Sequence, residues 1–147
     1  MSEEIENNWI RDWSGSYKLV AYRHSVGIDD LLEEDIKSIA SISNVIVMVG
    51  PKCRSVGLDF LDKYVSEIIA PSVDVYDKNK NWCLRISNVE GFAILGISRV
   101  LSDKFGKSRA IRARDDFIDY VTRGGVGFGA TGKRYALEQI CPYIWSE

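Results

Sequence analysis

The sequence predicts an α+β fold in which a small mixed or antiparallel sheet is packed by helices, and three observations lead to this prediction. Residues 45–49 form a continuous apolar, mostly β-branched run closed by Gly50 and Pro51, which is typical of a buried strand. Residues 73–76 and 82–86 flank a loop of turn-forming residues, as in a β-hairpin. The C-terminal third has apolar residues at helical spacing, so we expect it to be mostly helical.

The first quarter of the chain predicts a helix followed by a strand. Apolar residues recur at every fourth position from Ile5 through Trp9 to Trp13, which predicts a helix with one strongly apolar face. Ser14-Gly15 is expected to end this helix. Residues 17–24 are rich in aromatic and aliphatic side chains, and we expect them to form the first strand.

The next elements are expected to be helix, strand and helix. An aspartate at position 29 or 30 can cap a helix that runs to about Ile42. Residues 45–49 then predict a strand that is buried on both faces, and we place it at the centre of the sheet. Residues 58–68 have apolar positions at helical spacing, and Pro71 is expected to end that helix.

Three helices are expected after the hairpin. Ser87 and Glu90 have the spacing of a capping box, which predicts that a helix begins there and ends near Gly106. Ser108 can cap the next helix, and Pro142 is expected to kink or end a short last one. The apolar faces of these helices are predicted to consist of Ala93, Ile97, Val100 and Leu101, of Phe117, Ile118 and Val121, and of Leu137, Ile140, Cys141 and Ile144.

Composition predicts one globular domain that spans residues 1–147. A chain of 147 residues with 46% hydrophobic and 27% charged residues is large enough for its own core. Its three cysteines are far apart and form no C-x-x-C pair, so we expect a reducing, cytoplasmic environment, no metal and no cofactor. The acidic start does not resemble a signal peptide, and the longest uncharged apolar stretch, 38–51, is too short to span a membrane.

Charge is distributed unevenly along the chain. Residues 1–75 carry 7 Lys/Arg and 13 Asp/Glu, whereas residues 76–147 carry 12 Lys/Arg and 8 Asp/Glu. Spaced cations neutralise phosphates, and arginine can bind a phosphate through two hydrogen bonds. The leading hypothesis is therefore a non-enzymatic binding protein for an anionic partner, RNA more readily than DNA because no helix-turn-helix pattern is evident. The predicted contact residues are Arg99, Lys104, Lys107, Arg109, Arg112, Arg114, Arg123, Lys133 and Arg134.

A second hypothesis uses the acidic half of the chain. A small inhibitor of the immunity or antitoxin type masks a basic partner with acidic side chains, and large aromatic side chains anchor such interfaces. The residues predicted to contact a partner in this way are Trp9, Trp13, Glu33, Glu34 and Asp35. The alternative for the two tryptophans is packing on the protein's own sheet.

A third hypothesis is a small transferase that binds a phosphorylated cofactor at the loop Gly124–Gly132. Residues 127–132 match G-x-G-x-x-G, and residues 127–134 match seven of the eight positions of G-x-x-x-x-G-K-[ST]. Arg134 stands where the second motif needs a hydroxyl, and both motifs need a buried strand before the loop and a sheet after it. A loop between two helices is therefore the expected structure.

Two further groups of side chains resemble catalytic sites. Cys53 follows a predicted buried strand and has cations on both sides, which would suit a nucleophilic thiol. Asp59 occupies the arginine position of the phosphatase-type C-x5-R pattern, and His24 is the chain's one histidine, so we expect a structural cysteine. The aspartates 115, 116 and 119 are expected to lie on a solvated helix face.

Overall fold

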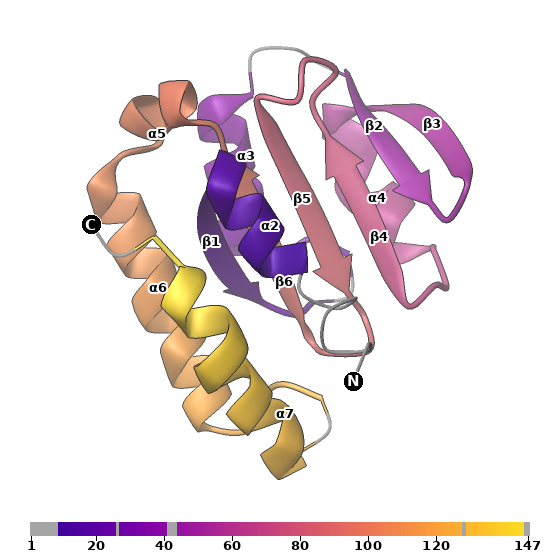
Figure 1. The fold of residues 1–147 in the computed structure, drawn as a ribbon. Coiled ribbons are helices and arrows are strands. Elements are labelled where there is room, and N and C mark those ends of the chain that lie inside the picture. Colours follow the sequence, from indigo (N-terminus) through magenta and orange to yellow (C-terminus); the bar gives the residue numbers. More distant parts are fainter. Residues whose placement is uncertain (1–8, 26, 41–43, 128, 146–147) are drawn as a thin grey trace.

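The structure is a computed structural model that describes residues 9–25, 27–40, 44–127 and 129–145. Its centre is a six-stranded sheet with the order β1-β6-β5-β4-β2-β3, in which every pair of neighbours is antiparallel (Figure 1). The strands are β1 (Lys18–Arg23), β2 (Asn44–Val49), β3 (Lys52–Gly57), β4 (Ser72–Tyr76), β5 (Trp82–Ser87) and β6 (Phe92–Ile97). The predicted α+β class is confirmed, and the sheet is antiparallel.

Helices cover both faces of this sheet (Figure 1). They are α2 (Trp9–Ser16), α3 (Asp30–Ile39), α4 (Leu61–Ser66), α5 (Arg99–Phe105), α6 (Lys107–Thr122) and α7 (Gly129–Tyr135). A short 3-10 turn, Leu58–Phe60, precedes α4, while α7 continues into a π-helical turn, Ala136–Ile140, and a 3-10 turn, Cys141–Tyr143. Among the described residues, no helix has the length and apolar character needed to cross a bilayer.

Side chains alternate between the two faces of each strand and so build two separate cores. On one face, Val20 and Tyr22 of β1 belong to a large core that includes residues of α3, α4 and α5. On the other face, Leu19 and Ala21 belong to a smaller core with residues of α2, α6 and the π-helical turn. Of the strands, only β1 and β6 contribute buried residues to this second core, so it covers one half of its face.

The two edges of the sheet differ. Beside β1, helix α6 contributes Ala113 to the first core and Phe117 to the second, so it closes this side of the sheet. The backbone N–H of Trp145 also donates to the carbonyl of Leu19, at 2.8 Å. The opposite edge is β3, which no described strand extends.

The strand predicted at the sheet centre lies elsewhere. β2 forms where expected, but it is second from the edge, between β3 and β4. No element was predicted between Pro51 and Leu58, whereas Lys52–Gly57 form β3. Gly50 and Pro51 form a two-residue connection in which Gly50 adopts a φ of 58°, a conformation that favours glycine.

The helix predicted after Ser87 is wrong, because that region is strand β6. One of the two capping-box hydrogen bonds does exist, with the Glu90 N–H donating to Ser87 Oγ at 3.1 Å, and the Ser87 hydroxyl in turn donates to Glu90 Oε1 at 3.1 Å. They stabilise the turn between β5 and β6 instead of a helix start. Phe92–Ile97 is buried at every position, so burial on both faces of the sheet outweighs the helical spacing.

The helix boundaries in the C-terminal third follow the prediction in part. Ser98 caps α5 by accepting a hydrogen bond from the Leu101 N–H at 3.3 Å. Gly106 ends α5 with a φ of 93°, as expected for a glycine terminator. Helix α6 begins immediately at Lys107, so Ser108 lies within the helix and is not its cap.

Among the remaining element predictions the strands agree with the structure, whereas several helix boundaries differ. Helix α3 ends at Ile39 instead of near Ile42, and α4 ends at Ser66. The segment 124–132 was expected to be a loop, but its last residues, Gly129–Gly132, belong to α7. The strands expected at 17–24, 73–76 and 82–86 correspond to β1, β4 and β5. The expected end of the first helix at Ser14-Gly15 is wrong, because α2 continues through both residues to Ser16. The part of this helix predicted before Trp9 lies outside the described residues.

Candidate functional site

The centre of the predicted basic surface is occupied by ion pairs within the molecule. Arg109 Nη1 lies 2.9 Å from Asp35 Oδ1, and Arg112 Nη2 lies 3.1 Å from the same oxygen. The Tyr22 hydroxyl donates to the other carboxylate oxygen of Asp35 at 2.7 Å. Asp35 has no exposed surface. Burial and the charge of Asp35 together raise the pKa of the Tyr22 hydroxyl well above its usual value, so this hydroxyl stays protonated and donates.

The acidic residues predicted to mask a partner belong to the same network. Arg112 Nη2 lies 3.1 Å from Glu34 Oε1, and Arg109 Nη1 lies 3.8 Å from it. Glu33 pairs instead with Lys37 within α3, at 3.8 Å. Two of the acidic candidates and two of the basic candidates therefore neutralise one another across the contact between α3 and α6.

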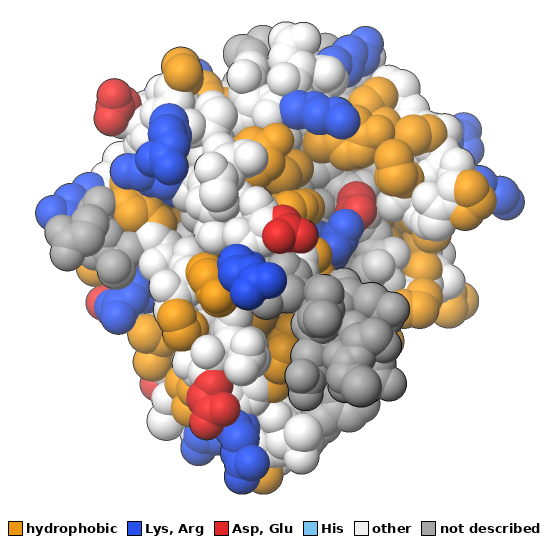
Figure 2. All heavy atoms as spheres, viewed as in Figure 1, with side chains coloured by type: hydrophobic (Ala, Val, Ile, Leu, Met, Phe, Trp, Pro, Cys, Tyr) orange, Lys and Arg blue, Asp and Glu red, His pale blue; other side chains and the backbone are white. Residues whose placement is uncertain are grey.

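The other predicted cations divide into paired and unpaired groups. Arg123 pairs with Asp119 at 2.6 Å, and Arg114 lies 3.9 Å from Asp115. The remaining five make no ion pair within the described part of the chain: Arg99, Lys104, Lys107, Lys133 and Arg134. The first three lie on α5 and at the start of α6, and the last two lie on α7, at the other end of α6 (Figure 1). On the face drawn in Figure 2, Lys and Arg side chains are scattered among acidic and apolar ones.

The two predicted anchor tryptophans pack on the protein's own sheet. Their ring centroids lie 4.9 Å apart in an edge-to-face arrangement, and both are half-buried against the second core. The Arg85 guanidinium lies 4.5 Å from the Trp9 ring centroid and 5.3 Å from that of Trp13, and it forms a bidentate pair with Asp74. The tryptophans and the acidic residues of α3 are on opposite faces of the sheet, so they do not form one surface.

The glycine-rich segment is held against the turn between β5 and β6. The Gly127 N–H donates to the Glu90 carbonyl at 2.9 Å, and a Cβ on Gly127 would lie 2.5 Å from the Val89 carbonyl oxygen. A Cβ on Gly125 would similarly meet the ring of Tyr120. These glycines allow close approach of two backbones and a ring, which accounts for them without a phosphate.

Within the described ranges, the side chains considered for catalysis lie apart from one another and have other neighbours. The Cys53 thiol is exposed on β3, and its hydrogen-bonding neighbour is the Tyr76 hydroxyl at 3.6 Å. His24 contacts the Asn88 side chain at 2.9 Å and is not beside Cys53. Asp116 forms a bidentate pair with Arg23, at 2.8 and 3.0 Å. No group of three metal-binding side chains occurs within the described ranges.

Edge strand β3 and its surroundings form a surface that the sequence analysis missed. Lys52 and Arg54 lie opposite Val49 and Val47 of β2, and so point to the same face of the sheet as α4. There they border a cavity of about 550 Å³, which is lined by Val47, Val49, Lys52, Cys53, Arg54, Tyr64 and Ile68. Two strongly exposed apolar side chains, Phe60 and Ile69, flank α4. We call β3 with this cavity the β3 surface.

The other face of the same hairpin is also apolar and only partly covered. Ile46 and Met48 of β2 are half-buried there, as is Tyr76 of the neighbouring strand β4, and none of them belongs to the second core. Figure 2 shows hydrophobic side chains gathered where Figure 1 places β2 and β3. The two-residue connection at Gly50-Pro51 is the sequence signal that could have revealed this hairpin.

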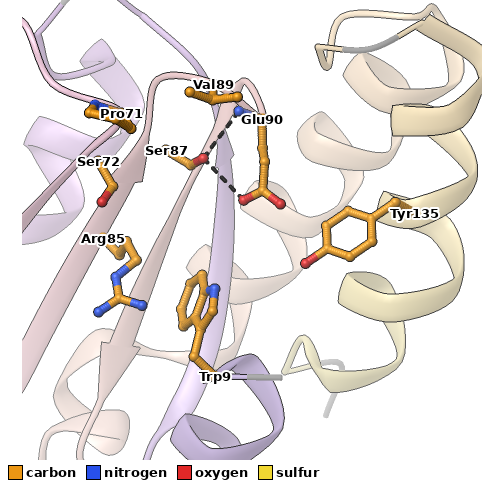
Figure 3. A pocket seen from close by; sticks show the side chains of 8 residues that line it. All are labelled: Trp9, Pro71, Ser72, Arg85, Ser87, Val89, Glu90 and Tyr135. Carbon is orange, nitrogen blue, oxygen red and sulfur yellow. Dashed lines mark hydrogen bonds between the residues drawn. The ribbon is translucent and has the colours of Figure 1, made fainter. Parts of the chain in front are cut away.

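A second concave region lies on the half of the sheet that α2 covers. It is a cavity of about 400 Å³, lined by Trp9, Pro71, Ser72, Arg85, Ser87, Val89, Glu90 and Tyr135 (Figure 3). Burial, together with the charge of Glu90, raises the pKa of the Tyr135 hydroxyl to about 12. This hydroxyl therefore stays protonated at neutral pH.

Comparisons of the chain with family models, with curated proteins and with solved structures found no match. The geometry of these surfaces therefore carries the functional argument.

Proposed function

We propose that this chain is a non-enzymatic binding protein that recognises an acidic, extended segment of a partner protein at the β3 surface. The observation that carries the proposal is an open edge strand with two unpaired cations beside an apolar cavity. The proposal keeps the anionic partner expected from the sequence, but moves the contact from the C-terminal helices to the β2–β3 hairpin.

The backbone of β3 is open to pairing with a further strand. An edge strand presents N–H and C=O groups that can pair with an additional strand, a common mode of peptide recognition. Lys52 through Ser55 are all exposed. At the opposite edge of the sheet, α6 and the segment at Trp145 occupy the corresponding position. Strand addition is therefore expected at β3.

The positive charges of β3 favour an acidic partner. Lys52 and Arg54 make no ion pair with any described residue. A second copy pairing symmetrically through β3 would place cations opposite one another, which is unfavourable across two strands. Acidic side chains at alternate positions of a partner strand would instead face both cations. This complementarity favours an acidic partner over self-association.

The cavity beside β3 adds an apolar surface to these charges. Arg54 lies over the ring of Tyr64, with the guanidinium carbon 5.8 Å from the ring centroid, so a charged group and apolar walls meet in one place. Exposed apolar area next to an edge strand is characteristic of protein interfaces. In an added strand that alternates apolar and acidic residues, the acidic side chains face Lys52, Arg54 and this cavity, whereas the apolar ones lie on the other face of the sheet, the face of Ile46 and Met48.

Nucleic acid is the competing partner. The unpaired cations of α5 and α6 and those of α7 lie at different ends of the molecule, whereas a nucleic-acid strand needs a continuous line of phosphate contacts (Figure 1). Arg109 and Arg112, at the centre of the predicted surface, already bind Asp35. These observations favour the protein partner.

The test uses a nine-residue peptide that alternates valine and glutamate, titrated into isotope-labelled protein. We expect amide shifts in β3 and slower hydrogen exchange of its outward N–H groups. The double variant Lys52→Glu/Arg54→Glu should weaken binding at least about tenfold, since two favourable charge pairs become repulsive. The matched charge control is Lys104→Glu/Lys107→Glu on α5 and α6, which should bind the peptide as the unaltered protein does.

Two outcomes would overturn the proposal. One is equal binding of a valine–lysine peptide, or shifts that do not include β3. The other is binding of a single-stranded RNA that the Lys104→Glu/Lys107→Glu variant loses and the hairpin variant keeps. The second result would restore the nucleic-acid hypothesis.

A further inference from the structure

The cavity in Figure 3 lies away from the β3 surface and contains a different combination of side chains. Its walls come from α2, from strands β4 and β5 with the β5–β6 turn, and from α7, which the chain brings together from distant positions. About 400 Å³ is within the range of small-molecule sites. Each charged group in its wall has a distinct environment, and these environments indicate what the cavity can hold.

Two charged groups line this wall, Arg85 and Glu90, and the negative charge of Glu90 also acts on Arg85. Arg85 is neutralised by Asp74, with hydrogen bonds of 2.7 and 2.9 Å. Glu90 forms no ion pair within the described residues, and its carboxylate accepts a hydrogen bond from the neutral hydroxyl of Ser87 at 3.1 Å. The net charge presented to the cavity is therefore negative, which favours a cation.

Aromatic rings flank this carboxylate. Figure 3 shows the Tyr135 side chain reaching toward the Glu90 carboxylate, with Trp9 beside them. The Trp9 ring already has a guanidinium 4.5 Å from its centroid, so its faces suit a positive charge. A carboxylate combined with aromatic faces is an arrangement that binds alkylated ammonium groups, since the rings attract the charge without requiring it to donate hydrogen bonds.

A smaller cavity adjoins the first and shares two of its walls. It has a volume of about 170 Å³ and is lined by Glu90, Phe92, Gly127, Thr131, Gly132 and Tyr135. Beyond the shared Glu90 and Tyr135, its side chains are one phenyl ring and one threonine. An apolar group attached to the cation is accommodated here.

We infer that these adjoining cavities bind a small organic cation, with an alkylated ammonium group against Glu90, Trp9 and Tyr135 and an apolar group toward Phe92. The site is independent of the β3 surface, so either proposal can fail without the other.

The experiment titrates choline and its uncharged isostere 3,3-dimethylbutan-1-ol into isotope-labelled protein at millimolar concentrations. We expect choline to shift the Trp9 indole N–H and the Glu90 backbone amide, and the isostere to bind at least about fivefold more weakly, since a cation on an aromatic face and beside a carboxylate gains about 1 kcal/mol or more. Benzyltrimethylammonium should bind more tightly than choline and also shift the Gly127 and Gly132 amides.

The variants separate charge from packing. Glu90→Gln keeps the shape and an oxygen that can accept from the Ser87 hydroxyl, and should weaken choline binding about tenfold while the melting temperature changes little. Glu138→Gln, an exposed glutamate outside the cavity, removes the same charge and should bind choline as before. Equal binding of choline and its isostere, no shift at Trp9, or equal loss in both variants would each overturn the inference.

Discussion

Replacing Asp35 with asparagine tests whether the arginines of α6 stabilise the fold through one buried carboxylate. The carboxylate accepts hydrogen bonds from Arg109 and Arg112 at 2.9 and 3.1 Å and from Tyr22 at 2.7 Å. The asparagine can still accept from Tyr22, but it carries no charge for the arginines. Hydrogen bonds to charged groups contribute about 1.5–3 kcal/mol each, and losing a partner from a buried ion pair costs about 3–5 kcal/mol.

The exposure of each partner sets the expected magnitude. The arginine side chains are 35% and 49% exposed, so water and Glu34 can take up their charges when Asp35 is lost. We therefore expect Asp35→Asn to lower the free energy of unfolding by about 2–3 kcal/mol, below the full cost of a buried pair. The double variant Arg109→Ala/Arg112→Ala leaves the buried carboxylate without a countercharge and should cost more, about 3–5 kcal/mol.

The assay is urea unfolding followed by tryptophan fluorescence. Glu34→Gln is the matched control, because Glu34 contacts the same arginines but is 60% exposed, and it should cost less than about 1 kcal/mol. If Glu34→Gln costs as much as Asp35→Asn, burial does not set the strength of this network. If the double arginine variant lowers the free energy of unfolding less than Asp35→Asn does, the buried carboxylate does not depend on its countercharges more than the exposed arginines depend on the carboxylate, and the reasoning from exposure is refuted.

Three further predictions concern the thiols and the glycines. Burial raises the pKa of the Cys83 thiol to about 12, so between about pH 9 and 12 the thiol is ionised in the unfolded chain but protonated in the folded one. The free energy of unfolding should therefore fall as the pH rises through this range, by up to about 1.4 kcal/mol per pH unit. The Cys83→Ala variant should show a shallower pH dependence of the urea midpoint. At pH 8, Ellman's reagent should modify the exposed Cys53 well before Cys83, and mass spectrometry of the labelled peptides would show the reverse order if this burial is wrong. Gly127→Ala should destabilise the protein by about 1–3 kcal/mol, since its Cβ would lie 2.5 Å from a backbone oxygen. In contrast, the Cβ of Gly15→Ala in α2 meets no atom within 4 Å, and this variant should raise the melting temperature slightly.

The sequence predicted those elements whose local pattern and tertiary environment agree. The hairpin of β4 and β5 combines alternating strands with a polar turn, and both its range and its pairing are confirmed. Residues 92–97 show the opposite case. Their apolar residues suit a helix face and a buried strand equally well, and only the neighbours β1 and β5 decide between the two.

Charges were the least predictable part of the candidate site. Arg109 and Asp35 are 74 positions apart, and nothing in the local sequence indicates that α3 and α6 would bring them together. The cations of β3 were missed for a different reason, since no strand was predicted at residues 52–57 and the edge position of Lys52 and Arg54 was therefore not considered. Counts of charge along a chain therefore say little about which charges a partner can reach.

The closure of the sheet beside β1 limits how this protein can assemble. In the language of polymer chemistry, a molecule with two reactive ends propagates a chain, whereas a molecule with one reactive end terminates it. Within the part of the chain that the structure describes, helix α6 and the Leu19–Trp145 hydrogen bond leave β3 as the one edge of the sheet at which a strand can add. Edge pairing should therefore produce complexes with one added strand for each chain, and not fibres of unlimited length.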